Sequence, residues 1–297
     1  MYHFNHLMVG LTVGSQDKAK IRYASLVSSL VASKKITFVH VGSSADMSPD
    51  IYKQKMRELV TLYYKGPSDV TLEYHFVENT PHVIEEMLQL FVDMDVDLII
   101  VGKISGEFTG SETIPVKLTR KAQCSVLFVP EDARPSRTRP KEMNILVPVD
   151  FSENSADAVL MAIDFASAHH IPTIYSIHVY DVPLGYYKRG KSFEEFEIIM
   201  RKNAKEKFKE FIEDFDFKGR EIKSYFRQEK KPYKAIEEIV GKNMIDLIVI
   251  GARGRKVAAG LMLESVTEQL IRKTTVPLLA VKKKNKGMGI LGAISEL

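Results

Sequence analysis

The sequence has 297 residues, of which 45% are hydrophobic and 27% charged, the ordinary composition of a soluble globular protein. Its net charge of +4 is small and its basic residues are spread along the chain, so nothing here indicates nucleic-acid binding. One cysteine excludes an internal disulfide, and no leader-like start or apolar run near ~20 residues indicates export or a membrane span, so we expect a cytoplasmic protein.

Strands and helices alternate along the first part of the chain. The expected strands cover residues 7–11, 36–41, 70–77, 98–101 and 125–129, and the expected helices cover residues 17–32, 48–65 and 81–94. Short, continuous apolar runs such as residues 98–101 are typical of parallel strands that are buried on both faces. The alternation therefore predicts right-handed crossovers and a sheet with helices on both faces.

A polar segment, residues 132–142, carries two prolines and four basic residues and reads as a solvated linker, with a basic binding patch as the alternative. The pattern then restarts. The expected strands cover residues 144–150, 174–180, 221–226, 247–250 and 276–281, and the helices cover residues 155–169, 192–215, 233–240 and a stretch from 265. We therefore predict domains at residues 1–131 and 143–283, followed by a glycine-rich tail at 284–297.

The two parts share motifs in the same order. The segment Asp97-Leu-Ile-Ile-Val-Gly102 repeats Asp246-Leu-Ile-Val-Ile-Gly251, and His40-Val41 answers His178-Val179. Thr113 precedes Ser125 by the same 12 residues that separate Ser265 from Pro277. The chain is thus predicted to be a tandem duplication whose repeat is a whole domain.

An anion site is predicted where the strand that ends at Gly251 meets the next helix. Gly251 and Gly254 allow backbone conformations and close approaches that other residues do not. Ser265 and Glu268 have the spacing of a capping box, which places a helix start at Ser265. Backbone N–H groups of a glycine turn and of a helix N-terminus attract anions such as phosphate.

These motifs resemble the universal stress protein family. The second half is similar over its whole length, from Ile145-Leu-Val-Pro-Val-Asp150-Phe-Ser152 through His178-Val179 to Gly251-x-x-Gly254 and Ser265-Val266-Thr267-Glu268, while the first half is similar but eroded. The chain looks like the tandem type of that family. The resemblance implies an α/β fold of two Rossmann-like (adenine nucleotide alpha hydrolase-like) domains, each with a five-stranded parallel sheet.

The resemblance also implies that an adenine nucleotide (ATP, ADP or AMP) binds at the carboxyl ends of the strands, with Mg²⁺ only alongside the nucleotide. Asp150 would meet the ribose or adenine side, and Val179 would offer backbone groups to the adenine. The residues implied to surround the ligand are Pro148, Val149, Asp150, Val179, Ile250, Gly251, Arg253, Gly254, Ser265, Val266 and Thr267. The sequence contains no evident catalytic pair and no metal-ligand spacing.

Two departures from the family pattern bear on binding. Glu264 stands where nucleotide-binding members have glycine before the Ser or Thr, and Glu112 takes the same place in the first half. Like charges ~5 Å apart repel by ~3 kcal/mol at an effective dielectric of about 20, unless Glu264 instead supports its helix N-terminus. In the first half Thr12 replaces Asp150 and Ser105 replaces the second glycine, so we expect no nucleotide there.

Three functions follow as alternatives: a stress-response regulatory protein whose second domain binds an adenine nucleotide, a nucleotide-free adaptor or chaperone-like scaffold, and a slow ATP hydrolase. The first ranks highest, and without a positioned general base we do not expect an enzyme. Because a bare sheet edge is normally covered, we predict that residues 125–129 and 277–281 pair as an intramolecular pseudo-dimer, with a homodimer also open.

Overall fold

A computed structural model of the protein describes residues 4–42, 47–78, 83–102, 113–133, 140–183, 190, 192–252 and 266–283. The chain divides into two compact units. The first comprises Met1–Thr138 and Thr274–Leu297, and the second comprises Arg139–Lys273. The domain boundaries predicted from the sequence remain a prediction, and the last strand groups with the first unit.

The first unit contains a parallel sheet with one antiparallel strand. Its strands are β1 (His6–Leu11), β2 (Lys35–Gly42), β3 (Thr71–Glu78), β4 (Leu98–Gly102), β5 (Ser125–Val129) and β10 (Leu278–Val281), in the spatial order β3-β2-β1-β4-β5-β10. The first five pair in parallel, and β10 pairs antiparallel with β5. The predicted pairing of the two terminal strands is thus confirmed.

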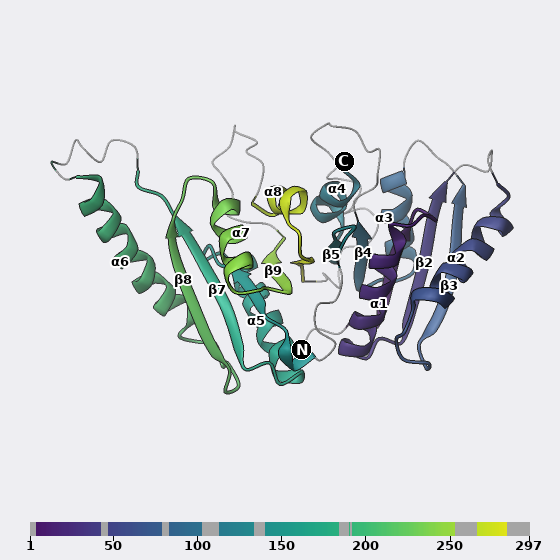
Figure 1. Cartoon of the computed structure of the whole chain (residues 1–297), viewed down its shortest axis with the longest axis horizontal. Helices are drawn as coiled ribbons and strands as arrows, with labels where there is room; N and C mark the ends of the chain where they lie inside the picture. Colours follow the sequence, from purple (N-terminus) through teal and green to yellow (C-terminus); the bar gives the residue numbers. More distant parts are fainter. Residues whose placement is uncertain are drawn as a thin grey trace. The chain divides into compact units, whose positions relative to one another are not determined.

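Helices connect the parallel strands of the first unit (Figure 1). They are α1 (Asp17–Val31), α2 (Pro49–Tyr63), α3 (Val83–Asp93) and α4 (Ile114–Lys121). Helix α1 packs along β1 and β4, and α2 packs on β3. Strands β4 and β5 are buried along their whole length, as their continuous apolar sequences predict. Cys124, the single cysteine, is buried in the hydrophobic core of this unit.

The second unit repeats the same arrangement of strands and helices. Its strands are β6 (Ile145–Pro148), β7 (Thr173–Tyr180), β8 (Glu221–Gln228) and β9 (Leu247–Gly251), all parallel, in the order β9-β6-β7-β8. Its helices are α5 (Glu153–Ala168), α6 (Phe193–Ile212), α7 (Pro232–Lys242) and α8 (Val266–Lys273), and a 3₁₀ turn, Pro140–Glu142, precedes β6. The parallel α/β fold predicted from the alternation is confirmed in both units.

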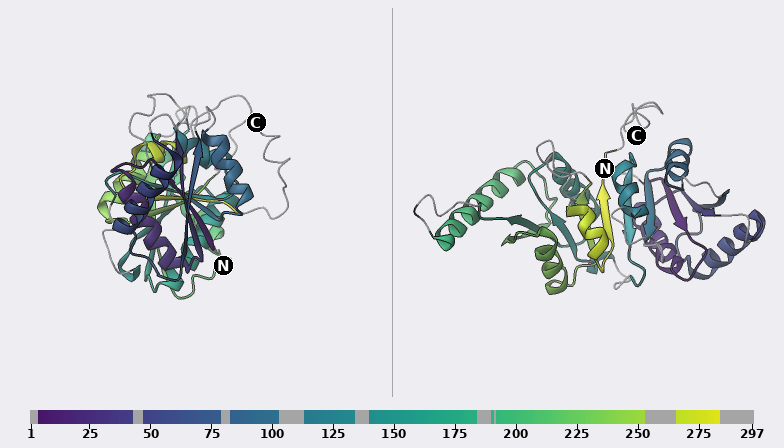
Figure 2. Two further views of the ribbon diagram at one scale, coloured as in Figure 1. Left: turned by 90° about the vertical axis from the view of Figure 1, so that its right-hand side faces the viewer. Right: turned by 90° about the horizontal axis from the view of Figure 1, so that it is seen from above.

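The long helix α6 packs on β7 and β8 (Figure 2). Its capping box is present, because the Ser192 side chain accepts from the Glu195 N–H and the Glu195 side chain accepts from the Ser192 N–H. Phe196, Ala204 and Phe208 are buried on its inner face. Within the described ranges, no helix is long and apolar enough to cross a membrane.

Candidate functional site

The candidate site of the second unit lies where β6 and β9 end. These two strands are neighbours, with Leu146 opposite Ile248, so the register brings their carboxyl ends to the same edge. Strand order reverses between them, since β7 and β8 lie on the far side of β6. In open parallel sheets, ligands bind at the carboxyl edge beside such a reversal. Asp150 follows β6 at this edge, and Gly251 is the last residue of β9.

Gly251 is required by close packing. A Cβ atom at this position would lie 2.5 Å from the backbone carbonyl of Asn154 in the first turn of α5, and real Cβ contacts are not that short. Its carbonyl oxygen accepts a hydrogen bond of 3.3 Å from Thr267 Oγ1 in the first turn of α8. Gly251 therefore joins the end of β9 to the N-terminal turns of two helices, which are favourable places for an anion.

Asp150 belongs to a tight turn between β6 and α5. Its Oδ1 atom accepts from the backbone N–H of Ser152 at 3.0 Å and from the Ser152 hydroxyl. Ser152 caps α5, because its Oγ accepts from the Ser155 N–H at 3.2 Å. This is an ordinary structural role for a carboxylate after a strand. It is compatible with a ligand contact, since a carboxylate has acceptor sites on two oxygens.

Phe151 and His178 form an aromatic pair beside this turn that the sequence did not single out. Phe151 has φ +64, a left-handed conformation that is uncommon for residues other than glycine. Its ring stacks on His178 with a centroid distance of 4.2 Å. His178 Nδ1 lies 2.8 Å from the Val149 carbonyl oxygen, which can only accept, so Nδ1 carries a proton and donates. The ring position of His178 is thereby fixed at the end of β6.

At the end of β7, Val179 pairs with Arg227 of β8, and Tyr180 closes the strand. The Tyr180 hydroxyl donates to Glu197 Oε1 of α6 at 2.5 Å. Burial and this bond to a carboxylate raise the pKa of the Tyr180 phenol. Tyr180 is therefore a neutral hydrogen-bond donor that ties α6 to the edge next to Val179.

The structure places part of the predicted ligand-binding set at one edge. Pro148, Val149 and Asp150 end β6 and begin the turn, Val179 is in β7, Ile250 and Gly251 end β9, and Val266 and Thr267 begin α8. Arg253, Gly254 and Ser265 lie outside the described residues, as do Glu264, Glu112 and Ser105. The predicted phosphate side and the effect of Glu264 therefore remain predictions.

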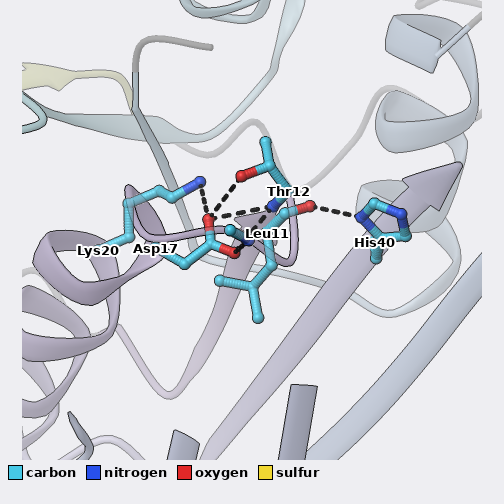
Figure 3. A network of polar contacts seen from close by, with 6 residues as sticks. Leu11, Thr12, Asp17, Lys20 and His40 are labelled. Carbon is cyan, nitrogen blue, oxygen red and sulfur yellow. Dashed lines mark hydrogen bonds and ion pairs between the residues drawn. The ribbon is translucent and has the colours of Figure 1, made fainter. Parts of the chain in front are cut away.

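The corresponding edge of the first unit has different chemistry (Figure 3). Thr12 stands in the place of Asp150, and Asp17 of α1 accepts from the Thr12 N–H, the Thr12 hydroxyl and the Gly14 N–H, all at 3.0–3.1 Å. Lys20 Nζ lies 2.7 Å from the same carboxylate. His40, like His178, contacts the carbonyl oxygen at the end of the first strand, here that of Leu11 at 2.9 Å.

Neither unit shows a metal centre in its described part, where no group of three or more histidine, cysteine, aspartate or glutamate side chains is placed to hold an ion. The described edge of the second unit thus offers the Asp150 carboxylate, backbone groups of β7 and β9, and the first turn of α8. This combination suits a polar, partly anionic organic ligand better than a bare metal ion.

Known proteins resemble both halves of the chain. The sequence profile of the Universal stress protein family matches residues 143–282. Universal stress protein MJ0577 of Methanocaldococcus jannaschii is 30% identical over 158 residues, which are 48% of this chain and 95% of that protein. Universal stress protein MJ0531 of the same organism is 31% identical over 144 residues, covering 48% of this chain and 83% of its own length.

Two solved structures match nearly the whole chain. A universal stress protein from Archaeoglobus fulgidus has a TM-score of 0.60 and 16% identity, and the match covers 95% of this chain and 99% of that one. A functionally unknown protein, PA1789, from Pseudomonas aeruginosa has a TM-score of 0.63 and 15% identity, with 99% and 95% covered. At 15–16% identity these two structures show only that both halves have this fold. The family is identified by the sequence match to MJ0577. The chain belongs to the universal stress protein family.

Proposed function

We propose that this protein is a stress-response regulator whose second half binds an adenine nucleotide at the carboxyl edge of β6, β7 and β9. Nucleotide occupancy would be the signal, and no chemical step is assigned to the chain. The domains proposed for this role are residues 1–131 and 143–283, in a cytoplasmic protein. ATP, ADP and AMP are the candidate ligands, with Mg²⁺ accompanying the phosphates.

One observation carries the proposal: Asp150, two residues after β6, and Gly251, the last residue of β9, follow neighbouring strands to the reversal of strand order. A carboxylate at this point can accept hydrogen bonds from ribose hydroxyls, and the starts of the two helices that meet at Gly251 are favourable places for a phosphate. Phe151 and Val149, the residues on either side of Asp150, are both held by His178, through ring stacking and through the hydrogen bond to the Val149 carbonyl oxygen.

The alternative is a nucleotide-free adaptor or chaperone-like scaffold. Glu264 favours it, because a carboxylate beside the phosphate position opposes a triphosphate electrostatically. Asp150 favours it as well, since its bonds to Ser152 already account for one carboxylate oxygen. The two functions differ in a directly measurable quantity, the affinity of the intact chain for nucleotide.

Calorimetric titration of the intact chain with ATP, ADP and AMP tests the proposal. Another universal stress protein has been solved in complex with cAMP, which makes cAMP a sensible further probe. Asp150→Asn keeps an oxygen for Ser152 but removes the charge, and it should weaken binding about tenfold, or ~1.4 kcal/mol. Glu210→Gln, an exposed position in the last turn of α6, is the matched control and should leave affinity unchanged. No binding of any of the four nucleotides would establish the scaffold alternative.

A further inference from the structure

The crevice of the first unit lies between β1 and β4. Strands β2 and β3 are on one side of β1, and β4 and β5 are on the other, so the strand order reverses at this point. The crevice is bounded by the turn that follows Leu11 and by Gly102, the last residue of β4. It corresponds to the candidate site of the second unit, and its contents decide whether the first half accepts a ligand.

Lys20 extends from α1 into this crevice. Its Cδ atom lies 3.2 Å from the position that a Cβ atom on Gly102 would occupy, so the lysine stem packs directly on the glycine backbone. The Lys20 side chain is only 3% exposed. Lysine is almost never this deeply buried unless its ammonium group is paired, because removing the charge from water is costly.

Asp17 is the partner of Lys20, and the chain itself satisfies it completely. The carboxylate is fully buried and accepts from two backbone N–H groups and one hydroxyl, in addition to the ammonium group at 2.7 Å (Figure 3). Val13, between the two N–H donors Thr12 and Gly14, has φ +60, which is a strained conformation for a β-branched residue. The left-handed residue aims both N–H groups at one point, as in backbone nests that bind anions. Here the anion is a side chain of the same unit.

The second unit lacks this pair. When Thr12 is aligned with Asp150, Asp17 corresponds to Ser155 and Lys20 to Ala158. In the second unit the carboxylate is instead that of Asp150, which takes the place of Thr12. It accepts a hydrogen bond from the backbone N–H of Ser152, the counterpart of Gly14. The counterpart of Gly102 is Gly251, whose nearest neighbours are atoms of Asn154.

We propose that the Asp17–Lys20 pair is a built-in occupant of the first unit's crevice, and that it confines adenine nucleotide to the second half. The stem of Lys20 fills the space at the strand reversal. Its charge is neutralised by Asp17, so the pair leaves a phosphate neither room nor an unpaired cation. This inference deepens the proposed function and rests on it only for the class of ligand.

The test is the number of nucleotide sites in the intact chain. Thr12→Asp/Asp17→Ser/Lys20→Ala gives the first half the residues of the second half at all three positions, and it should raise the number of sites by one in titrations with ATP and AMP. Asp17→Asn/Lys20→Met is the control, because it removes both charges but keeps the volume. It should fold and show the stoichiometry of the unaltered chain.

The outcomes separate this inference from the proposed function. One site in the unaltered chain and two in the triple variant support both. No site in the unaltered chain and one in the triple variant support the built-in occupant and overturn nucleotide binding by the second half. A folded triple variant that gains no site overturns the built-in occupant, as do two sites in the unaltered chain or a gained site in the volume-matched control.

A second measurement needs no variant. When the native chain is acetylated briefly and its lysines are quantified by mass spectrometry, Lys20 should be modified at least tenfold more slowly than the average of Lys34 and Lys55, two exposed lysines of the same unit. Modification of Lys20 at their rate would show that its ammonium group is open to solvent, and the inference would fail.

Discussion

The ammonium group of Lys282 donates a hydrogen bond to the backbone carbonyl oxygen of Ala122, 160 residues earlier in the chain. The same group donates to the Arg120 carbonyl at 3.2 Å, and the backbone N–H of Lys282 donates to Ser125 Oγ at 3.1 Å. The last carbonyls of a helix have no partner within the helix, and a cation there also suits the helix dipole. Lys282 therefore caps α4 and fixes the end of β10 beside the start of β5.

Replacing Lys282 by methionine should destabilise the first unit by about 1–2 kcal/mol, because charge-assisted bonds to two carbonyls are lost while most of the stem remains. Urea denaturation followed by circular dichroism measures the change. Lys273→Met is the control, since Lys273 is exposed at the end of α8 and its substitution alters the net charge equally. An equal effect of both substitutions would show that net charge, not the cap, is responsible.

The buried pair in the first unit should behave as a coupled unit. Lys20→Met alone leaves the Asp17 carboxylate buried without its cation and should destabilise by about 3 kcal/mol or more. Adding Asp17→Asn removes the unpaired charge, and most of the lost stability should return. A double-mutant cycle in urea gives the coupling energy. Additive losses would mean that the two side chains stabilise the fold independently.

Because the His6 side chain is buried, we expect the protein to lose stability at mildly acidic pH. Its Nδ1 lies 2.8 Å from the Met94 carbonyl oxygen and its Nε2 lies 2.8 Å from Thr37 Oγ1. Burial lowers the pKa of His6 below 6.5, outweighing the hydrogen bond to Met94 and the charges of Glu73 and Asp97, while Lys35 acts with burial. Burial likewise lowers the pKa of His40.

Because both histidines take up protons more readily when unfolded, stability should be constant well above pH 6.5 and decline as the pH falls through that value. Each histidine contributes a slope of at most about 1.4 kcal/mol per pH unit. His6→Asn should make the decline shallower, because asparagine does not titrate in this range. Asparagine is a suitable replacement, since Asn144 at the same place in the second unit donates to a backbone carbonyl at 2.8 Å. Urea midpoints between pH 5 and 8 provide the measurement, and an unchanged decline in the variant would contradict the assignment to His6.

Gly251→Ala should be strongly destabilising, by about 2 kcal/mol or more, because the added methyl group meets backbone atoms of Asn154 at 2.5 Å. Gly241→Ala is a matched control in the neighbouring helix α7. Nothing lies within 4 Å of an added Cβ there, so this substitution should stabilise by about 0.5–1 kcal/mol. We expect the thermal midpoint to fall in Gly251→Ala and to rise in Gly241→Ala. An unchanged midpoint in Gly251→Ala would mean that α5 is packed less closely on β9.

Glu264→Gly restores the family residue before Ser265 and should strengthen ATP binding about tenfold through relief of ~1.4 kcal/mol of repulsion. AMP binding should change less, because AMP carries fewer phosphates. Thermal midpoints need to be recorded beside the affinities, since a new glycine costs backbone entropy of about 1 kcal/mol. If the variant folds but still binds no ATP, the carboxylate is not what closes the site.

The sequence was sufficient for the fold because its signals are local. Continuous apolar runs such as residues 98–101 indicate buried strands, and the capping-box spacing of Ser265 agrees with a helix that starts at Val266. The pairing of β5 with β10 followed from a general argument about uncovered sheet edges. The antiparallel direction of that pair needed the structure, since a strand's orientation relative to a distant partner leaves no local pattern.

The candidate site was less predictable for a physical reason. No sequence motif singles out Lys20 and Asp17, because burial of a lysine depends here on the glycine at position 102 that the fold brings beside it. The positive φ of Phe151 and Val13 is likewise invisible in residue types that normally avoid it. The carboxylate after β6 was predictable from its position, but its bonds to Ser152 were not.

The pairing of β5 with β10 also sets an order of events during synthesis. Val129 leaves the ribosome 149 residues before Leu278, the first residue of its antiparallel neighbour. At roughly 5–20 residues per second, the edge of β5 waits on the order of ten seconds for that neighbour. During this interval an apolar strand presents unpaired N–H and C=O groups on a nascent chain, and on crowded polysomes it meets identical strands from other ribosomes. The first unit, whose strands β1 to β5 are synthesised first, is therefore complete only after β10 has been synthesised.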